Sequence, residues 1–135
     1  MIIIGHYAIK YEPFRQIQGI EEILHTSQNT IVWFDTAKLK EKGFEIAAHC
    51  HTHQIDYAVM IHSLEELLLY AALFPKYLIL PKAHKAKSYQ ALLNHYLLDC
   101  KLLCVIKSNA QLTKIAQLGI DGVIFKQVLD TISSR

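Results

Sequence analysis

Five short apolar runs recur at nearly regular intervals, and this repeat constrains the fold more than any other feature of the sequence. The runs begin at positions 31, 57, 77, 102 and 123, so neighbouring starts lie about 20 to 26 residues apart. An interval of that length fits one strand followed by one helix, and apolar runs without alternation are typical of strands covered on both faces. The pattern predicts a parallel α/β sheet.

The segments between the runs carry helical signals. Ser63 and Glu66 have the spacing of a capping box, and Pro75 ends the helix that follows. Ser108 or Asn109 is expected to cap a later helix, after which Gly119 occupies a position that favours a left-handed residue. The clearest helix has an apolar stripe at the spacing i, i+3, i+4, i+7 and i+8: Tyr89, Leu92, Leu93, Tyr96 and Leu97.

These elements predict an α/β fold built on an open, mainly parallel βα-repeat sheet. We expect five or six strands, the first over residues 2–4, with helices on both faces, in a flavodoxin/Rossmann-like or part-barrel arrangement. A closed eight-stranded barrel typically needs about 250 residues, so one copy of this chain would supply only part of such a barrel. No linker or low-complexity stretch interrupts the sequence, which predicts a single domain over residues 1–135.

Composition and charge narrow the class of protein. The 135 residues are 52% hydrophobic and 19% charged, which is enough apolar material for one core. A net charge of +2 is too small to predict a nucleic-acid partner. We expect no membrane partner and no secretory signal, because no apolar run approaches about 18 residues and the first residues lack a basic region and a cleavage site. Three cysteines do not make a disulfide framework, so a cytoplasmic location is expected.

A cluster of histidines, His49-Cys50-His51-Thr52-His53, raises the question of a metal site. The preceding apolar stripe favours a helix, on which Cys50 points inward and only His49 and His53 align. Two imidazoles without an acidic partner make an incomplete zinc site, and polar residues near a helix C-terminus also interact favourably with its dipole. We therefore predict no bound metal and no resident cofactor, and keep a zinc-dependent hydrolase using His49 and His53 as the weaker alternative.

The same segment resembles a motif of polysaccharide deacetylases, in which a glycine, a histidine, Glu-Ile and a zinc-binding His-x-x-x-His follow in order. The matching residues are Gly43, Glu45, Ile46, His49 and His53. Phe44 stands where that family has its first histidine, and Asp35 stands alone where the family has adjacent aspartates. The resemblance covers about fifteen residues, and we assign no membership from it.

Both ends of the chain resemble the opening and closing strands of glycerophosphodiester phosphodiesterases. The first resembling segment is residues 3–6 and the second is residues 118–124, with its Gly-x-Asp-Gly sequence. Tyr7 replaces the arginine that this family places after its histidine, and the paired acidic metal ligands are absent. The resemblance supports a βα fold and does not imply the chemistry.

Polar residues that follow the predicted strands mark the expected site, because ligands of open parallel sheets bind outside the carboxyl ends of the strands. Lysines near helix N-termini suit a phosphate or carboxylate, although lysines are also ordinary residues of solvent-facing loops and no Gly-rich phosphate loop is present. The candidate ligand-binding residues are Lys82, Lys107, Ser108, Asn109, Lys126, Asp35 and His62.

From these residues we expect a binding or interaction module with a site for an anionic small molecule. A small enzyme acting on a phosphorylated metabolite is the alternative. Asp35 and His62 both end strands and would form an acid–base pair if those strands are neighbours. No nucleophile with its base can be assembled from the sequence, so catalysis stays an open question.

A homo-oligomer is a further expectation. The helix predicted between Ser63 and Phe74 carries leucines and alanines around more of its surface than one sheet contact covers. Complete internal packing and an oligomer interface explain this excess equally well.

Overall fold

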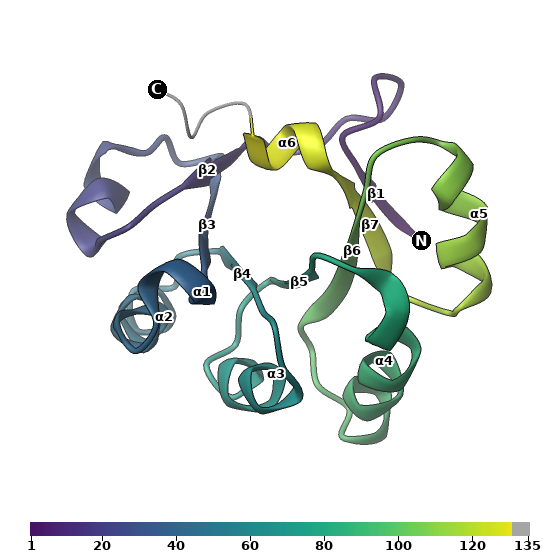
Figure 1. Cartoon of the computed structure of the whole chain (residues 1–135). Coiled ribbons are helices and arrows are strands. Elements are labelled where there is room, and N and C mark those ends of the chain that lie inside the picture. Colours follow the sequence, from purple (N-terminus) through teal and green to yellow (C-terminus); the bar gives the residue numbers. More distant parts are fainter. Residues whose placement is uncertain (131–135) are drawn as a thin grey trace.

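The computed structural model describes residues 1–130, in which seven parallel strands form one curled sheet surrounded by helices (Figure 1). The order of the strands across the sheet is β1-β7-β6-β5-β4-β3-β2, so β1 and β2 are its two edges. The strands are β1 (Ile2–Ile4), β2 (Phe14–Gln16), β3 (Ile31–Asp35), β4 (Tyr57–Met60), β5 (Tyr77–Leu80), β6 (Lys101–Ile106) and β7 (Gly122–Phe125).

The helices that connect the strands lie on the outer side of the curl (Figure 1). From β2 to β7 the strand order follows the sequence without reversal, and right-handed crossovers in one direction place every connecting helix on the same side. The prediction of helices on both faces was therefore wrong, and the part-barrel arrangement describes the sheet. The helices are η1 (Ile20–His25), α1 (Thr36–Leu39), α2 (Lys42–Thr52), α3 (Leu64–Ala71), η2 (Ala83–Lys85), α4 (Ala86–His95), α5 (Ala110–Gln117) and α6 (Lys126–Asp130).

The number of strands, seven over residues 1–130, also differs from the predicted five or six. The strand without a clear sequence signal is β2, which has three residues, follows Pro13 and includes the polar Arg15 and Gln16. It becomes a strand by pairing with β3, where Phe14 lies opposite Ile31. No local pattern indicates such a short edge strand, because its hydrogen bonds come from a partner distant in sequence.

The layer between sheet and helices is apolar and aromatic. Phe34 of β3 lies 6.2 Å from Tyr57 of β4 and 5.9 Å from Tyr70 of α3, measured between ring centroids. Cys50 of α2 is fully buried, as the helical stripe predicted. The predicted cap of α3 is confirmed, because the Ser63 hydroxyl accepts a hydrogen bond from the Glu66 N–H at 3.2 Å.

The stripe of α4 ends earlier than predicted. The helix stops at His95, and Tyr96 and Leu97 beyond it are exposed. Leu97 has a φ of 54°, so the chain turns away through a left-handed residue before the stripe can continue. At the end of α5, Gly119 has a φ of 74°, which is the left-handed conformation expected there.

Side chains from strands on different parts of the sheet meet inside the curl. Phe14 of β2 and Tyr77 of β5 stack with their ring centroids 6.1 Å apart, although their strands are not neighbours. At the carboxyl ends of the strands, α6 continues from β7 and packs against β2 (Figure 1). Its Gln127 amide donates a hydrogen bond to the Gly5 carbonyl at 3.3 Å. The sheet is thus an open barrel whose two edges are bridged at one end by α6.

Candidate functional site

A cavity of about 630 Å³ opens at the carboxyl ends of the strands. We call it the carboxyl-end cavity. Ligands of parallel α/β sheets bind at this end because the loops that follow the strands converge there. Residues from strands β2, β3, β4 and β6, from η2, α1, α5 and α6, and from the loops after β5 and β6 contribute to its lining: Gln16, Trp33, Asp35, Lys38, Met60, Pro81, Lys82, Ala83, Val105, Lys107, Gln111, Ile115, Lys126, Leu129 and Asp130.

The charges of this cavity are predominantly basic. Lys82 follows β5, and Lys107 follows the neighbouring strand β6. Within residues 1–130, neither of these ammonium groups forms an ion pair. Lys126 differs, because its Nζ lies 2.8 Å from Asp130 Oδ2, one turn along α6. The cavity therefore holds two lysines from adjacent strands whose charge no described acidic residue neutralises.

Asp35 and His62 meet at the rim of the cavity. Asp35 ends β3, and His62 lies two residues after the end of the neighbouring strand β4. His62 Nε2 donates to Asp35 Oδ1 at 2.7 Å. The same carboxylate oxygen accepts the backbone N–H of Ala37 at 2.9 Å and so caps α1. The Asp35 side chain is 15% exposed and the His62 side chain 39% exposed, so the carboxylate is the more enclosed partner. The condition set for an acid–base pair, that the two strands are neighbours, is met.

The contacts of Glu66 hold this pair in place. Its Oε1 accepts the backbone N–H of His62 at 2.7 Å and the hydroxyl of Thr36 at 2.8 Å. Thr36 follows Asp35 directly, so one carboxylate connects the residue after β3 to His62 in the segment that follows β4. The orientation of Asp35 and His62 thus depends on contacts on both of their chain segments.

The predicted site residues divide into three groups. Lys82, Lys107, Lys126 and Asp35 line the carboxyl-end cavity. His62 contacts Asp35 but does not itself contribute to the lining. Ser108 and Asn109 also lie outside the lining, and Asn109 is the N-cap of α5 without a side-chain hydrogen bond.

Sequence reasoning missed four polar residues of the lining: Gln16, Lys38, Gln111 and Asp130. Gln16 was missed because β2 itself was not predicted. Lys38 comes from the single turn α1, immediately after Asp35, where its proximity to a strand end was an available signal. Gln111 lies on α5, and its Oε1 accepts the Lys107 backbone N–H at 2.6 Å. This contact fixes the start of the segment that carries Lys107.

The histidines of α2 do not build a metal site. His49 and His53 stack with ring centroids 4.2 Å apart, but His53 Nδ1 lies 3.0 Å from the His49 carbonyl and must donate to it. Within residues 1–130, no group of three or more His, Cys, Asp or Glu side chains is placed to hold a metal ion. The zinc-hydrolase alternative therefore lacks a ligand set in this part of the chain.

The three cysteines are buried and free. Burial raises the pKa of Cys50 to about 12 and the pKa of Cys104 to about 11. For Cys100, burial again is the largest cause of a pKa of about 11. A thiol with such a pKa is protonated at neutral pH, so these cysteines are not nucleophiles.

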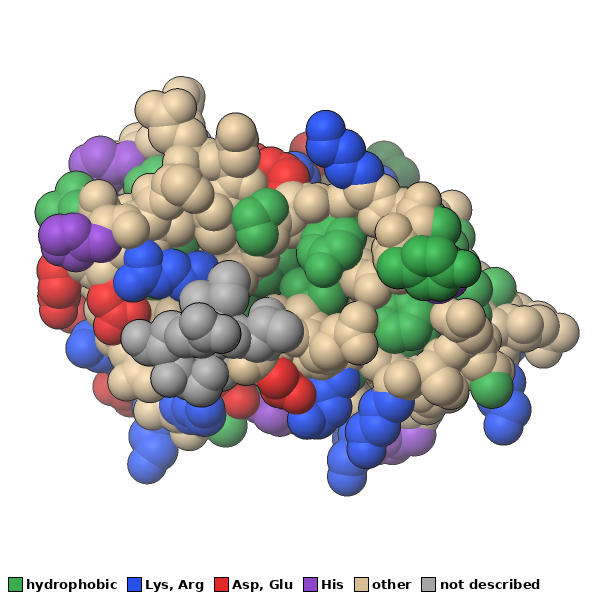
Figure 2. Space-filling view, turned by 90° about the horizontal axis from the view of Figure 1, so that it is seen from above, with side chains coloured by type: hydrophobic (Ala, Val, Ile, Leu, Met, Phe, Trp, Pro, Cys, Tyr) green, Lys and Arg blue, Asp and Glu red, His purple; other side chains and the backbone are tan. Residues whose placement is uncertain are grey.

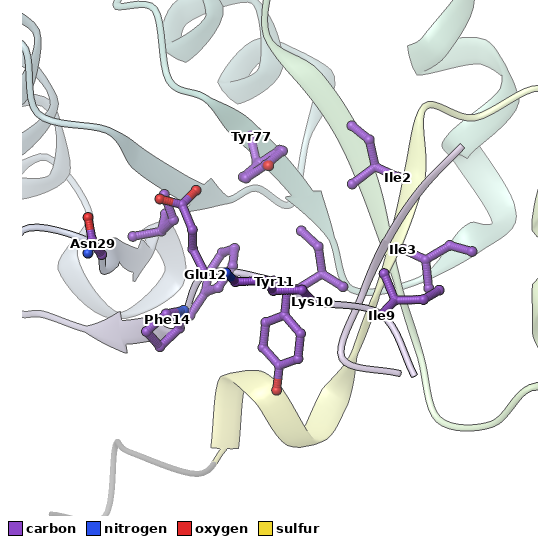
Figure 3. Close-up of a pocket in the computed structure, with 12 residues that line it drawn as sticks. Ile2, Ile3, Ile9, Lys10, Tyr11, Glu12, Phe14, Asn29 and Tyr77 are labelled. Carbon is purple, nitrogen blue, oxygen red and sulfur yellow. The ribbon is translucent and has the colours of Figure 1, made fainter. Parts of the chain in front are cut away.

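A second cavity, which we call the side opening, lies between the edges β1 and β2 (Figure 3). Its volume is about 670 Å³, and residues 9–13 of the β1–β2 connection run along it. Figure 3 shows Ile2 and Ile3 on one side, Phe14 on the other and Tyr77 from β5 behind them.

In the space-filling view toward α6, hydrophobic side chains gather near the centre and right of the surface, with Lys and Arg side chains along its lower border (Figure 2).

No family model matches the chain, and no curated protein matches it either. None of the helices in residues 1–130 is long and apolar enough to cross a bilayer. Fold and site together define a class: an α/β protein with a curled parallel sheet and a basic cavity at the carboxyl ends of its strands.

Proposed function

We propose that this protein binds a small anionic molecule, bearing a phosphate or carboxylate group, in the carboxyl-end cavity. One observation carries the proposal: Lys82 and Lys107 enter one cavity from adjacent strands, and neither forms an ion pair within residues 1–130. Cations held side by side repel each other, and a ligand anion relieves that repulsion.

The surroundings of the lysines support this proposal. Trp33, Met60 and Val105 supply apolar walls, as in most small-molecule sites, where a few polar groups fix the orientation of the ligand. Lys38 and Lys126 add positive charge, against which the cavity sets only Asp35 and Asp130 among its described residues. The buried free thiols fit the reducing compartment, the cytoplasm, in which we propose that the protein works.

The test is a titration with inorganic phosphate, followed by thermal unfolding. A ligand at about 100 times its dissociation constant adds roughly 2.7 kcal/mol to the free energy of unfolding, which moves the midpoint by several degrees. We expect that shift in the wild type and a clearly smaller one in Lys82→Ala and Lys107→Ala. The matched control is Lys114→Ala on α5, which lies outside the cavity lining. A shift that is unchanged in both cavity variants removes these lysines from the site.

Self-association through α3 is a second proposal, carried by a different observation. Leu67, Tyr70 and Ala71 are buried against the sheet, but Leu64, Leu68 and Leu69 are 38%, 43% and 49% exposed. Internal packing thus leaves part of the apolar surface of this helix uncovered. Sedimentation at high concentration should show a dimer that Leu68→Lys dissociates. A monomer in the wild type rejects this proposal and leaves the anion site untouched.

A further inference from the structure

We infer that the ligand of the carboxyl-end cavity carries hydroxyl groups opposite its anionic group, and is a polyol phosphate. This inference rests on the proposed function. The proposed function assigns the lysines to the phosphate of the ligand. This inference adds that Asp35 accepts a hydrogen bond from a hydroxyl of the same ligand.

The strand order separates the two halves of the cavity. Lys82, Lys107 and Lys126 follow β5, β6 and β7, which are consecutive neighbours in the sheet. Asp35 ends β3, and Met60 of β4 stands between it and the lysine-bearing strands. A ligand that spans the cavity therefore meets the unpaired Lys82 and Lys107 at one end and the Asp35 carboxylate, with Lys38 close to it, at the other.

The carboxylate is held so that one oxygen is engaged and the other is available. Oδ1 of Asp35 accepts two hydrogen bonds, from Ala37 N–H and from His62 Nε2. Within residues 1–130, no hydrogen bond is found at Oδ2, and the side chain lines the cavity. A carboxylate oxygen accepts and does not donate, so the group that faces Oδ2 must be a donor.

The neighbouring charges select the kind of donor. Lys38 lies on α1 close after Asp35, and three further lysines line the same cavity. These cations disfavour an ammonium group on the ligand, whereas a neutral hydroxyl is not repelled. A hydroxyl and a phosphate on one small carbon skeleton satisfy both halves of the cavity.

In this arrangement His62 is a positioning residue. It does not line the cavity, but its imidazole holds Asp35 Oδ1, and its own backbone is held by Glu66 at 2.7 Å. Removing the imidazole frees the carboxylate to rotate, and a side chain that still donates a hydrogen bond is expected to restore its orientation.

The experiment compares phosphates that carry hydroxyl groups with one that carries none, and glycerol 3-phosphate and propyl phosphate share the same three-carbon chain. Glycerol 3-phosphate and ribose 5-phosphate are titrated calorimetrically beside propyl phosphate, which has no hydroxyl on its carbon chain. In the wild type we expect the hydroxylated ligands to bind at least about tenfold more tightly than propyl phosphate. In Asp35→Ala we expect that preference, measured as the ratio of the two affinities in the same variant, to disappear. Asp35→Asn, whose amide oxygen can still cap α1, tests the same loss of the carboxylate if the alanine variant unfolds.

The His62 variants separate positioning from folding. His62→Ala is expected to lower the preference for the hydroxylated ligands, and His62→Gln, which retains a donor, to recover most of it. Equal affinity of wild-type protein for glycerol 3-phosphate, ribose 5-phosphate and propyl phosphate overturns this inference and leaves the anion site standing. Absence of binding by all three phosphates and by inorganic phosphate overturns the proposed function, and this inference with it.

Discussion

The carboxyl-end cavity and the side opening have nearly the same volume, about 630 and 670 Å³, and differ in the number and sign of their charged residues. The side opening is walled mainly by isoleucines and aromatic residues, among them Phe14 and Tyr77. At its margin, Glu12 is paired with Lys76, with Oε1 and Nζ 3.0 Å apart. The carboxyl-end cavity carries Lys82 and Lys107 without such partners in the described chain.

The packing of the fold accounts for the side opening but not for the charges of the carboxyl-end cavity. Buried apolar side chains stabilise the folded state. The side opening, which lies between such side chains, is therefore explained by packing around the open edge of the sheet. Unpaired charges of one sign contribute nothing to folding and repel one another. Under the proposal above, a ligand anion accounts for their presence at the carboxyl ends, and the predictions below test this distinction.

The largest effect is expected at the wall of the side opening. Phe14 is buried and stacks on Tyr77, so Phe14→Ala should lower the free energy of unfolding by about 3 to 5 kcal/mol. Urea denaturation measures this. Lys107→Ala, the matched change in the other cavity, should stay within about 0.5 kcal/mol of wild type. A loss below about 1 kcal/mol in Phe14→Ala would show that the wall is not structural and would break the comparison.

The Asp35 carboxylate lines the carboxyl-end cavity and also has a structural role. Asp35→Ala removes the cap that accepts the Ala37 N–H, and we expect a loss of about 1 kcal/mol. Asp35→Asn should lose less, because its amide oxygen still accepts that hydrogen bond. If the two variants are equally destabilised in urea, the capping contact is not the cause.

A smaller effect is expected at the ion pair of the side opening. Lys76 and Glu12 are both substantially exposed, so Glu12→Gln should cost about 0.2 to 1 kcal/mol at low ionic strength. The loss should shrink in 0.5 M salt, because salt screens exposed charges. A loss that is the same at both salt concentrations would contradict an electrostatic origin.

The smallest effect concerns the phenol of Tyr77. Burial raises its pKa, and the nearby Lys76 ammonium offsets part of that rise. In the unfolded chain a tyrosine ionises near pH 10, so above that pH the unfolded state holds fewer protons than the folded state, and stability falls as pH rises. Urea denaturation at pH 8 and pH 10.5 should show a smaller fall in Tyr77→Phe than in wild type. An identical fall would mean that the phenol ionises alike in both states.

The elements that the sequence predicted are those with a strong local pattern. The apolar runs became β3 to β7, Ser63 caps α3, and Cys50 points inward from α2. Of the candidate site, the lysines that follow consecutive strands were predictable because βα loops converge at one end of a parallel sheet. The prediction that the helix continues through Tyr96 and Leu97 was wrong, because an apolar stripe does not show at which residue a helix ends.

Local sequence patterns predicted the βα repeat, the parallel sheet and the polar residues at the strand ends, because periodicity and capping act over a few neighbouring residues. The tertiary structure set the strand order, the curl, the pairing of β2 with β3 and the place of α6 across the open edge. It also decided that Asp35 and His62, 27 residues apart in the chain, meet at 2.7 Å. The physical reason is that strand pairing joins residues that no local pattern connects, and the contacts of the site follow from that pairing.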